Sequence, residues 1–280
     1  MKTKKIISTV LYHFFIAALG FLMVYPVLWM ISGSLKNNSE ILSGSLSLIP
    51  PAWRWDNYAR GFKGFGHVTF TTYFKNSFII TIIATLGTVI SSALIAYALS
   101  RIKFRGRKFW FTIMIGTMLL PGQVVMIPQY LIYNRIHWVG TPLPLIVPHF
   151  FGAPFFIYMM MQFMASIPRE LDEAAIIDGC SKYSVFTRVV FPLLKPSLIS
   201  TIIIQFYWKW DDYMGPMLYL GKPTSYTVSI AVKLFADATS KTDYGAMFAM
   251  STLSMIPVFV IFLVFNRYLV DGISTSGLKG

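Results

Sequence analysis

Residues 73–99 read YFKNSFIITIIATLGTVISSALIAYAL, and this apolar stretch decides the class of protein. A helix that crosses the hydrocarbon core of a membrane needs about 20 mostly apolar residues, and this stretch is longer than that. Five further stretches also qualify, at residues 9–31, 109–133, 143–165, 196–220 and 246–269. The sequence therefore predicts an all-α integral membrane protein with six transmembrane helices, in a single transmembrane domain over residues 1–280.

The composition is typical of a membrane protein and excludes a soluble domain. Of the 280 residues, 55% are hydrophobic and 12% are charged, whereas soluble domains contain roughly 25% charged residues. The net charge of +13 could indicate nucleic-acid binding. However, Lys and Arg gather in short loops beside apolar runs, as they do in cytoplasmic loops. We therefore expect a lipid bilayer around the chain and no nucleic-acid partner. The single cysteine, Cys180, excludes an internal disulfide.

The distribution of basic residues predicts the orientation of the chain. With the N-terminus in the cytoplasm, 14 of the 24 Lys and Arg residues fall in cytoplasmic segments and eight in external segments. Five of the 14 lie within residues 101–108. Because positive charge marks cytoplasmic loops, we expect both termini inside. The apolar run from Ile6 to Ile31 is longer than the core of a signal peptide, which indicates a retained first span.

Several of the expected spans contain proline. Proline is tolerated inside a membrane bundle because neighbouring helices and water can satisfy the freed backbone groups. At Pro121-Gly122 we expect a kink, which is either a hinge or merely a bend in the helix.

External residues 32–72 contain Pro50-Pro51 and several aromatic residues, and they form either a folded cap or an interfacial segment.

The cytoplasmic segment 166–196 is too polar to enter the bilayer, and it predicts a helix, a glycine turn and a second helix. Pro168 suits the first position of a helix, where a missing N–H is no loss. Gly179 suits the left-handed residue just beyond a helix C-terminus. Ser181 can cap the second helix, which we expect to stop at Pro192.

One face of the first helix in this segment offers a docking surface. The residues at spacing i, i+3, i+4 and i+7 are Leu171, Ala174, Ala175 and Asp178. The two alanines leave the backbone approachable and acidic residues flank them, as in a helix that lies in a partner's groove. The alternative is an interfacial helix on lipid headgroups, which the acidic residues oppose because the cytoplasmic leaflet is negative.

Several motifs carry a resemblance to a known family. Glu173-Ala174-Ala175, Asp178-Gly179, Phe186, Pro192 and Pro196 resemble the EAA loop of permease subunits in binding-protein-dependent ABC importers. The carbohydrate branch, with its MalG-like maltose-transporter subunits, is similar in three further stretches: Leu120-Pro121-Gly122-Gln123 with Ile127-Pro128; Phe206 to Tyr213 with Pro216; and Tyr244-Gly245 through Ile256-Pro257 to Lys279-Gly280. The resemblance covers nearly the whole chain. It departs at Cys180, where Ala is usual, and at Asp211, where Asn is common.

This resemblance implies a type I ABC-importer permease in the bacterial inner membrane that transports a carbohydrate, and we expect this carbohydrate to be an oligosaccharide. The alternatives are a related solute such as glycerol phosphate, or an ATP-independent secondary transporter. The implied partners are a second, different permease chain, two cytoplasmic ATPase subunits and an extracellular or periplasmic solute-binding protein. The residues implied to couple this chain to the ATPases are Leu171, Glu173, Ala174, Ala175, Asp178 and Gly179.

The chain lacks the motifs of an ATP-hydrolysing enzyme. A P-loop needs Gly, four residues, then Gly-Lys-Ser/Thr to hold phosphate. The nearest match, Gly215 followed by Gly221-Lys222-Pro223, has five intervening residues and a proline in the last position. The four histidines show no metal-ligand spacing. We therefore expect a non-catalytic subunit without metal or cofactor, with ATP and magnesium bound by the partner ATPases.

The fifth expected span contains ionisable residues. Lys209 and Asp212 are three residues apart and can pair. Charges inside a membrane usually face a cavity and mark a pathway, but an aromatic belt with a snorkelling lysine is the alternative. The candidate pathway residues are Gln123, Tyr207, Trp210, Asp211 and Asp212.

Overall fold

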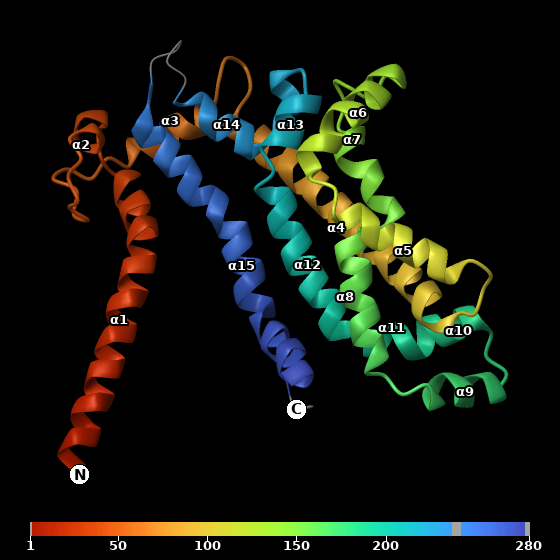
Figure 1. The fold of residues 1–280 in the computed structure, drawn as a ribbon. Helices are drawn as coiled ribbons and strands as arrows, with labels where there is room; N and C mark the ends of the chain where they lie inside the picture. Colours follow the sequence, from red (N-terminus) through yellow and green to blue (C-terminus); the bar gives the residue numbers. More distant parts are fainter. Residues whose placement is uncertain (1, 237–241, 278–280) are drawn as a thin grey trace. The chain divides into compact units, whose positions relative to one another are not determined.

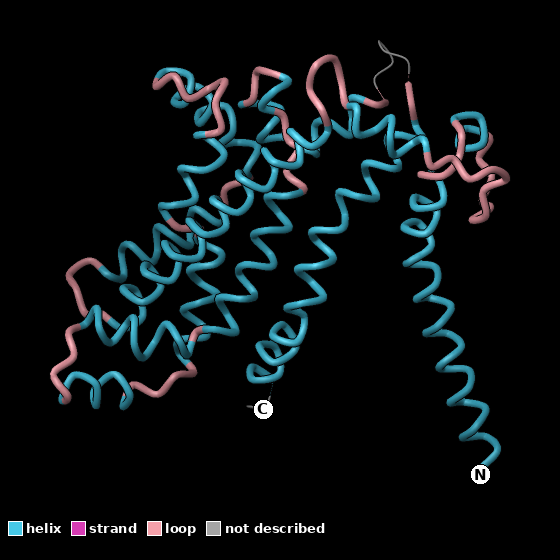
Figure 2. The backbone as a smooth tube through the Cα atoms, turned by 180° about the vertical axis from the view of Figure 1, so that it is seen from behind, coloured by secondary structure: helices cyan, strands magenta, loops and turns pink. Residues whose placement is uncertain are grey.

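The computed structural model describes residues 2–236 and 242–277, with side chains described for residues 7–236 and 242–265. Lys241 and Lys279, which enter the charge count, lie outside the described residues. No strand occurs in this described part, where Phe65 and Val68 form one isolated bridge (Figure 2). The helices are α1 (Lys2–Gly33), α2 (Asn38–Leu42), α3 (Asp56–Lys63), α4 (Phe70–Arg101), α5 (Arg107–Met118), α6 (Gly122–Arg135), α7 (Leu143–Ile146), η1 (Val147–Phe151), α8 (Pro154–Ala165), α9 (Glu170–Ile177), α10 (Lys182–Val185), η2 (Phe186–Val190), α11 (Phe191–Leu193), α12 (Lys195–Trp210), α13 (Met214–Tyr219), η3 (Pro223–Ser225), α14 (Val228–Leu234) and α15 (Tyr244–Gly277).

The described helices confirm an all-α fold with candidate membrane spans. Four helical segments are long and apolar enough to cross a membrane: Ile7–Gly33, Phe70–Arg101, Leu143–Ala165 and Tyr244–Phe265. Two further pairs pass the same test but are bent, α5 with α6 by 104° and Lys182–Leu193 with α12 by 73°. When each bent pair counts as one span, the described chain has six candidate spans, which is the predicted number. The second pair also includes Lys182–Leu193, which the sequence places in the cytoplasmic segment.

The break within predicted span 109–133 lies at the expected place. α5 ends at Met118 and α6 begins at Gly122, with Pro121 in an extended conformation between them (ψ 133°). Proline has no N–H for an α-helical ladder and disfavours the α conformation in the residue before it. The kink expected at Pro121-Gly122 is therefore confirmed, and the bend is too large for a continuous helix.

The end of predicted span 196–220 is wrong. α12 stops at Trp210, and a short turn separates it from α13. The carboxylate of Asp212 closes this turn, because its Oδ1 accepts the N–H of Gly215 at 3.0 Å. Aspartate side chains commonly bind nearby backbone N–H groups in this way. Asp211 and Asp212 therefore lie beyond the last helical residue and not inside a continuous span.

The chain forms two compact units, and the first comprises Met1–Thr71 and Ala231–Ile256. In this unit, the most apolar 18-residue stretch of Ile7–Gly33 in α1 is 0% buried. A helix that is hydrophobic all round and has no protein cover is suited to lipid. The exposed side chains of α1 are therefore suited to contact with lipid or with other membrane helices.

Residues 32–71 of the first unit form a folded segment around Asn57. The fully buried Asn57 amide donates from Nδ2 to the carbonyls of Ser34 and Lys36, each at 2.8 Å. The start of α15 packs closely on the same side chain, since a Cβ added to Gly245 would lie 2.7 Å from Asn57 Nδ2. This fixed packing favours the folded cap over a loose interfacial segment.

The second unit comprises Thr72–Ile230 and Pro257–Gly280, and its core includes the polar loop. α4 and α8 contribute side chains that are fully buried, and helices of segment 166–196 complete the same cluster. Its most buried members are Ala93, Ala96, Met160, Met164, Val190 and Leu194. Segment 166–196 is therefore packed against the spans rather than free.

The two ends of the second unit carry different helices. α9, α10 and α11 gather at one end, and α6, α7 and α13 lie at the other (Figures 1 and 2). At the first end, Arg101 Nη2 donates to Met164 O at 2.8 Å. At the other end, Gly140 N donates to Tyr219 O at 2.8 Å. The segments predicted to be cytoplasmic in this unit thus share one end, and the external ones share the opposite end.

Candidate functional site

The turn inside segment 166–196 has the local structure that its residues predict. Gly179 has a φ of +84°, a conformation that costs glycine no steric strain. Cys180 N donates to Ala175 O at 2.9 Å and Gly179 N donates to Ile176 O at 3.0 Å, which together make a Schellman motif. Ser181 then caps α10, accepting the N–H of Ser184 at 3.2 Å. The prediction of a helix, a glycine turn and a second helix is therefore confirmed.

Two boundaries in this segment differ from the prediction, whereas the C-terminus of α9 lies where Gly179 predicts it. α9 begins at Glu170, so Pro168 lies before the helix and not in its first position. α9 ends at Ile177, and Asp178 is its C-cap residue. The second helix passes Pro192 and ends at Leu193. Pro192 lies near the start of α11, directly after the π-helical stretch η2.

The docking face inferred from the spacing of α9 is divided in the structure. Ala175 is buried and belongs to the core of the second unit. Leu171, Glu173 and Ala174 remain exposed. Ile177, which the spacing did not single out, is 85% exposed. Exposed large apolar side chains beside acidic ones mark an interaction surface more strongly than single scattered ones do, so the free surface of α9 is apolar and acidic.

An ion pair holds α9 to the end of α4. Arg101 Nε lies 3.4 Å from Asp172 Oδ2, and the two side chains are 6% and 13% exposed. Arg101 Nη2 also donates to the carbonyls of Met164 and Ile167, at 2.8 and 2.6 Å. The guanidinium therefore joins the ends of α4 and α8 to the first turn of α9. Sequence reasoning missed this pair, because nothing local relates residues so far apart in the chain.

A second contact joins the loop to α4. Tyr97 OH donates to Lys182 O at 3.1 Å, and the Tyr97 ring packs 5.0 Å from the Phe186 ring. A tyrosine buries a large apolar area and still finds a hydrogen-bond partner for its hydroxyl. This contact therefore fixes the start of α10 against α4.

The residues proposed for a pathway lie around the end of α12. Lys209 Nζ binds Asp212 Oδ2 at 2.9 Å, so the predicted pairing is confirmed. Trp210 is 6% exposed and packs on Phe78 and Phe206 with ring centroids 4.7 and 5.6 Å apart. Trp210 is thus a core residue and no part of an exposed aromatic belt.

The other candidates are exposed and are not all brought together. Tyr207 and Asp211 lie at the surface near the end of α12, and Gln123 is exposed at the start of α6. Within the described residues, no hydrogen bond links Gln123 to residues 207–212. The structure therefore groups Tyr207, Trp210, Asp211 and Asp212 by their position on one helix end, and leaves Gln123 apart.

A buried polar cluster was not foreseen from the sequence. His149 Nδ1 lies 3.1 Å from Thr88 Oγ1 and 3.2 Å from Gln205 Nε2. Ser91 Oγ donates to His149 O at 3.1 Å. Buried polar groups need such partners, and these tie η1 to α4 and α12. Across the described part of the chain, no three His, Cys, Asp or Glu side chains are placed to hold a metal ion.

Comparisons with known proteins agree with this architecture. Residues 89–275 match the family described as "Binding-protein-dependent transport system inner membrane component". The chain is 33% identical to the "Probable ABC transporter permease protein YurM" of Bacillus subtilis, over 92% of this chain and 84% of that protein. It is 30% identical to the "Arabinooligosaccharides transport system permease protein AraQ" of Halalkalibacterium halodurans, over 100% of this chain and 99% of that protein.

A solved structure shares the fold. It is described as a bacterial ABC transporter involved in the import of the acidic polysaccharide alginate, and one of its chains superposes with a TM-score of 0.81. The sequences are 22% identical, and the match covers 94% of this chain and 96% of that one. The family match covers most of the chain, and the described helices include several candidate membrane spans. The chain is therefore a multi-pass membrane protein that belongs to the family of inner membrane components of binding-protein-dependent transport systems.

Proposed function

We propose that this chain is a permease subunit of an ATP-driven importer of oligosaccharides. The observation that carries the proposal is the anchored loop: a helix with a free acidic and apolar surface, tied to two spans by Arg101. A relative identical at 30% over the whole chain is named for arabinooligosaccharide transport. Glycerol phosphate as the solute, and an ATP-independent transporter, are the alternatives.

The proposed role of α9 is to couple transport to ATPase subunits in the cytoplasm. Glu173 and Ala174 are exposed, and Ile177 adds apolar surface beside them. A helix with an approachable backbone and charge at its rim fits a groove on a protein partner. A negative membrane surface would repel the acidic residues of α9, which disfavours a helix lying on lipid headgroups. ATP and magnesium would bind to those partner chains, and this chain would be non-catalytic.

The proposed solute pathway runs past the end of α12. Asp211 is exposed in the turn after the helix, next to the partly buried pair of Lys209 and Asp212. Polar groups inside a membrane protein usually face a cavity or the bundle interior. A second permease chain would supply the other half of the pathway. A solute-binding protein would deliver the oligosaccharide from outside, as the family description implies.

The proposed orientation places both termini and α9 in the cytoplasm. It is supported by the basic residues between α4 and α5, which lie at the α9 end of the second unit. Lys182 is exposed beside the turn, so a Lys182→Cys variant in a Cys180→Ala background can report its side. A membrane-impermeant thiol reagent should label it only after the cells are opened. Labelling in intact cells would reverse the orientation.

The function is tested by reconstituting the chain with its partner permease, ATPases and binding protein in liposomes. We expect uptake of a labelled oligosaccharide that requires both ATP and the binding protein. Uptake that persists without ATPase subunits and follows an ion gradient would instead identify a secondary transporter. Uptake of glycerol phosphate in place of any oligosaccharide would reassign the solute and leave the permease function intact.

A further inference from the structure

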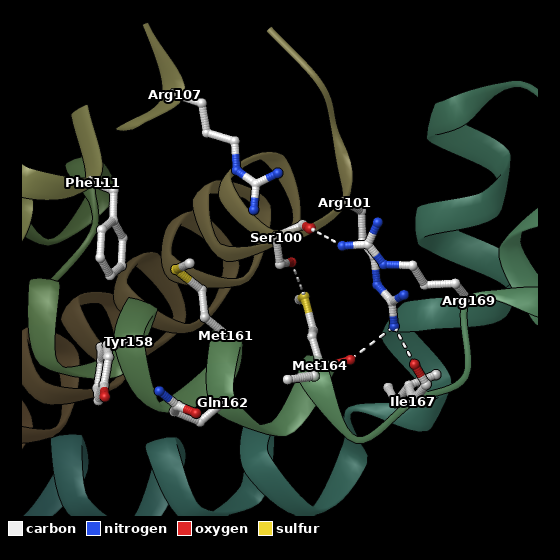
Figure 3. A pocket seen from close by; sticks show the side chains of 11 residues that line it. Ser100, Arg101, Arg107, Phe111, Tyr158, Met161, Gln162, Met164, Ile167 and Arg169 are labelled. Carbon is white, nitrogen blue, oxygen red and sulfur yellow. Dashed lines mark hydrogen bonds between the residues drawn. The ribbon is translucent and has the colours of Figure 1, made fainter. Parts of the chain in front are cut away.

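A pocket of about 330 Å³ lies at the α9 end of the second unit. Its walls come from the end of α4, the start of α5, the end of α8 and the residues that lead into α9 (Figure 3). It is separate from the exposed surface of α9 and from the end of α12. The pocket shares Arg101 with the anchor of α9, but the proposed solute pathway does not include it.

The pocket contains more positive charge than its surroundings neutralise. Arg101, Arg107 and Arg169 all line it. Asp172 pairs with Arg101 and is not part of the lining. Within the described residues, no carboxylate pairs with Arg107 or Arg169, and Arg169 Nη2 makes a long hydrogen bond of 3.4 Å to Ser100 O. Two guanidinium groups are therefore left to bind an anion, and their planar forks match the oxygens of a phosphate.

The opposite wall of the pocket is largely apolar. Phe111, Met161 and Tyr158 lie on one side of the pocket, and Arg107 extends toward its middle (Figure 3). Just outside, Phe109 and Trp110 are 62% and 58% exposed at the start of α5. Aromatic side chains in such positions are enriched at membrane–water interfaces. A ligand that fills both halves of the pocket has an anionic head and an apolar chain.

We propose that this pocket binds an anionic phospholipid of the cytoplasmic leaflet, with its phosphate between Arg107 and Arg169 and an acyl chain along Phe111 and Met161. The inference rests on the proposed orientation, which places the pocket at the leaflet that carries negative charge. Basic pockets between membrane helices on that side suit lipid headgroups. Arg101 and Arg169 line the pocket and also hold the start of α9. A bound lipid would therefore restrict the motion of these two side chains and of the start of α9.

The test uses the full chain assembled with its partner subunits in nanodiscs. One set of discs contains phosphatidylcholine alone, and the other contains an equal mixture of phosphatidylcholine and phosphatidylglycerol. Native mass spectrometry then measures the lipid retained per complex after transfer into detergent. An Arg107→Gln/Arg169→Gln variant should retain at least about tenfold less phosphatidylglycerol than the unmodified chain. A Lys103→Gln/Lys108→Gln variant loses the same charge from exposed positions outside the pocket, and it should retain as much as the unmodified chain.

Four outcomes would overturn the inference. If both variants lost the same amount of phosphatidylglycerol, the lipid would be attracted to charge without a specific site. If the unmodified chain retained as much phosphatidylcholine as phosphatidylglycerol, the site would be merely apolar. Binding of inorganic phosphate as tight as that of phosphatidylglycerol would identify a free anion as the ligand. A photoreactive residue at Gln162 that crosslinks to a partner subunit would identify a protein occupant.

Oligosaccharide uptake by the same preparations separates this inference from the proposed function. Uptake without selective lipid retention would refute the lipid site alone. Lipid retention without any ATP-driven uptake would refute the proposed function alone.

Discussion

Arg101 at the end of α4 and Asp172 in the first turn of α9 form a buried ion pair, with Nε and Oδ2 3.4 Å apart. Asp172 Oδ1 is buried and accepts no hydrogen bond within the described residues. Arg101 therefore supplies the compensation for this carboxylate. The pair sets the position of the proposed coupling helix relative to the membrane spans.

Asp172→Asn should destabilise the loop, because it leaves the Arg101 charge buried without its counterion. Removing one partner of a buried pair typically costs about 3–5 kcal/mol. We expect a lower thermal unfolding midpoint for the assembled complex and weaker coupling of ATP hydrolysis to uptake. Glu170→Gln, in the same turn but exposed, is the matched control and should leave both quantities unchanged. Unfolding midpoints that agree between the two variants would show that the pair does not hold α9.

Glu173→Ala should weaken the association with the ATPase subunits while the membrane fold persists. Glu173 is exposed on α9, and in the proposed interface its carboxylate would accept a charge-assisted hydrogen bond from an arginine of the ATPase. Truncating one side of such a pair costs about 2–5 kcal/mol, or at least about 30-fold in affinity. The measurement is ATPase binding to the chain in nanodiscs, with Glu173→Asp as the conservative variant. Wild-type affinity and wild-type stimulation of hydrolysis in Glu173→Ala would exclude this residue from the interface.

Ala174→Trp and Ala175→Trp should both weaken ATPase binding, but for different reasons. Ala174 is exposed, so an indole there blocks the approach of a partner and leaves the unfolding midpoint unchanged. Ala175 is packed in the core, where added volume typically costs about 1–3 kcal/mol and forces neighbouring groups to move. Thermal unfolding and ATPase binding, measured on both variants, distinguish the two effects. A stable Ala175→Trp variant that binds ATPase normally would contradict this assignment of faces.

Gly179→Val should disrupt the turn between α9 and α10. The φ of +84° places Gly179 in the left-handed region, which costs a residue with a Cβ roughly 1–2 kcal/mol and more when it is β-branched. Gly179→Asn should be milder, because asparagine tolerates this conformation. Gly221→Val is the control, since Gly221 is exposed, has no positive φ and has open space where a Cβ would be added. We expect reduced uptake only in the Gly179 variants, in the order Val below Asn.

Asp211→Asn and Asp212→Asn should separate the solute pathway from the fold. Asp211 is exposed, so its neutral variant should assemble normally and change the rate or the preference of uptake. Asp212 binds both Lys209 Nζ and Gly215 N, so its neutral variant should lower the unfolding midpoint. Uptake of an oligosaccharide series, beside thermal unfolding, gives both readouts. An unaltered uptake profile for Asp211→Asn would remove this residue from the pathway.

The sequence by itself determined the features that depend on local chemistry. Apolar runs of about 20 residues define membrane spans whatever their neighbours are, and four described helical segments follow them without a sharp bend. Gly179 and Ser181 define the turn before α10, because a positive φ and a side-chain cap are properties of single residues. The pairing of Lys209 with Asp212 follows from their separation of three residues. The break at Pro121-Gly122 is likewise local in origin.

Only the tertiary structure decided which surface each residue meets. The spacing of α9 puts Ala174 and Ala175 on one face, but the packing of α10 and η2 on α9 leaves Ala175 buried and Ala174 exposed. The hydropathy of residues 196–220 also continues past the point where the Asp212 carboxylate ends the helical run. The contact of Arg101 with Asp172 joins residues from different helices, as does the pocket lined by Arg107 and Arg169. Such contacts depend on how packed helices meet in space, and no local pattern of residue types encodes that.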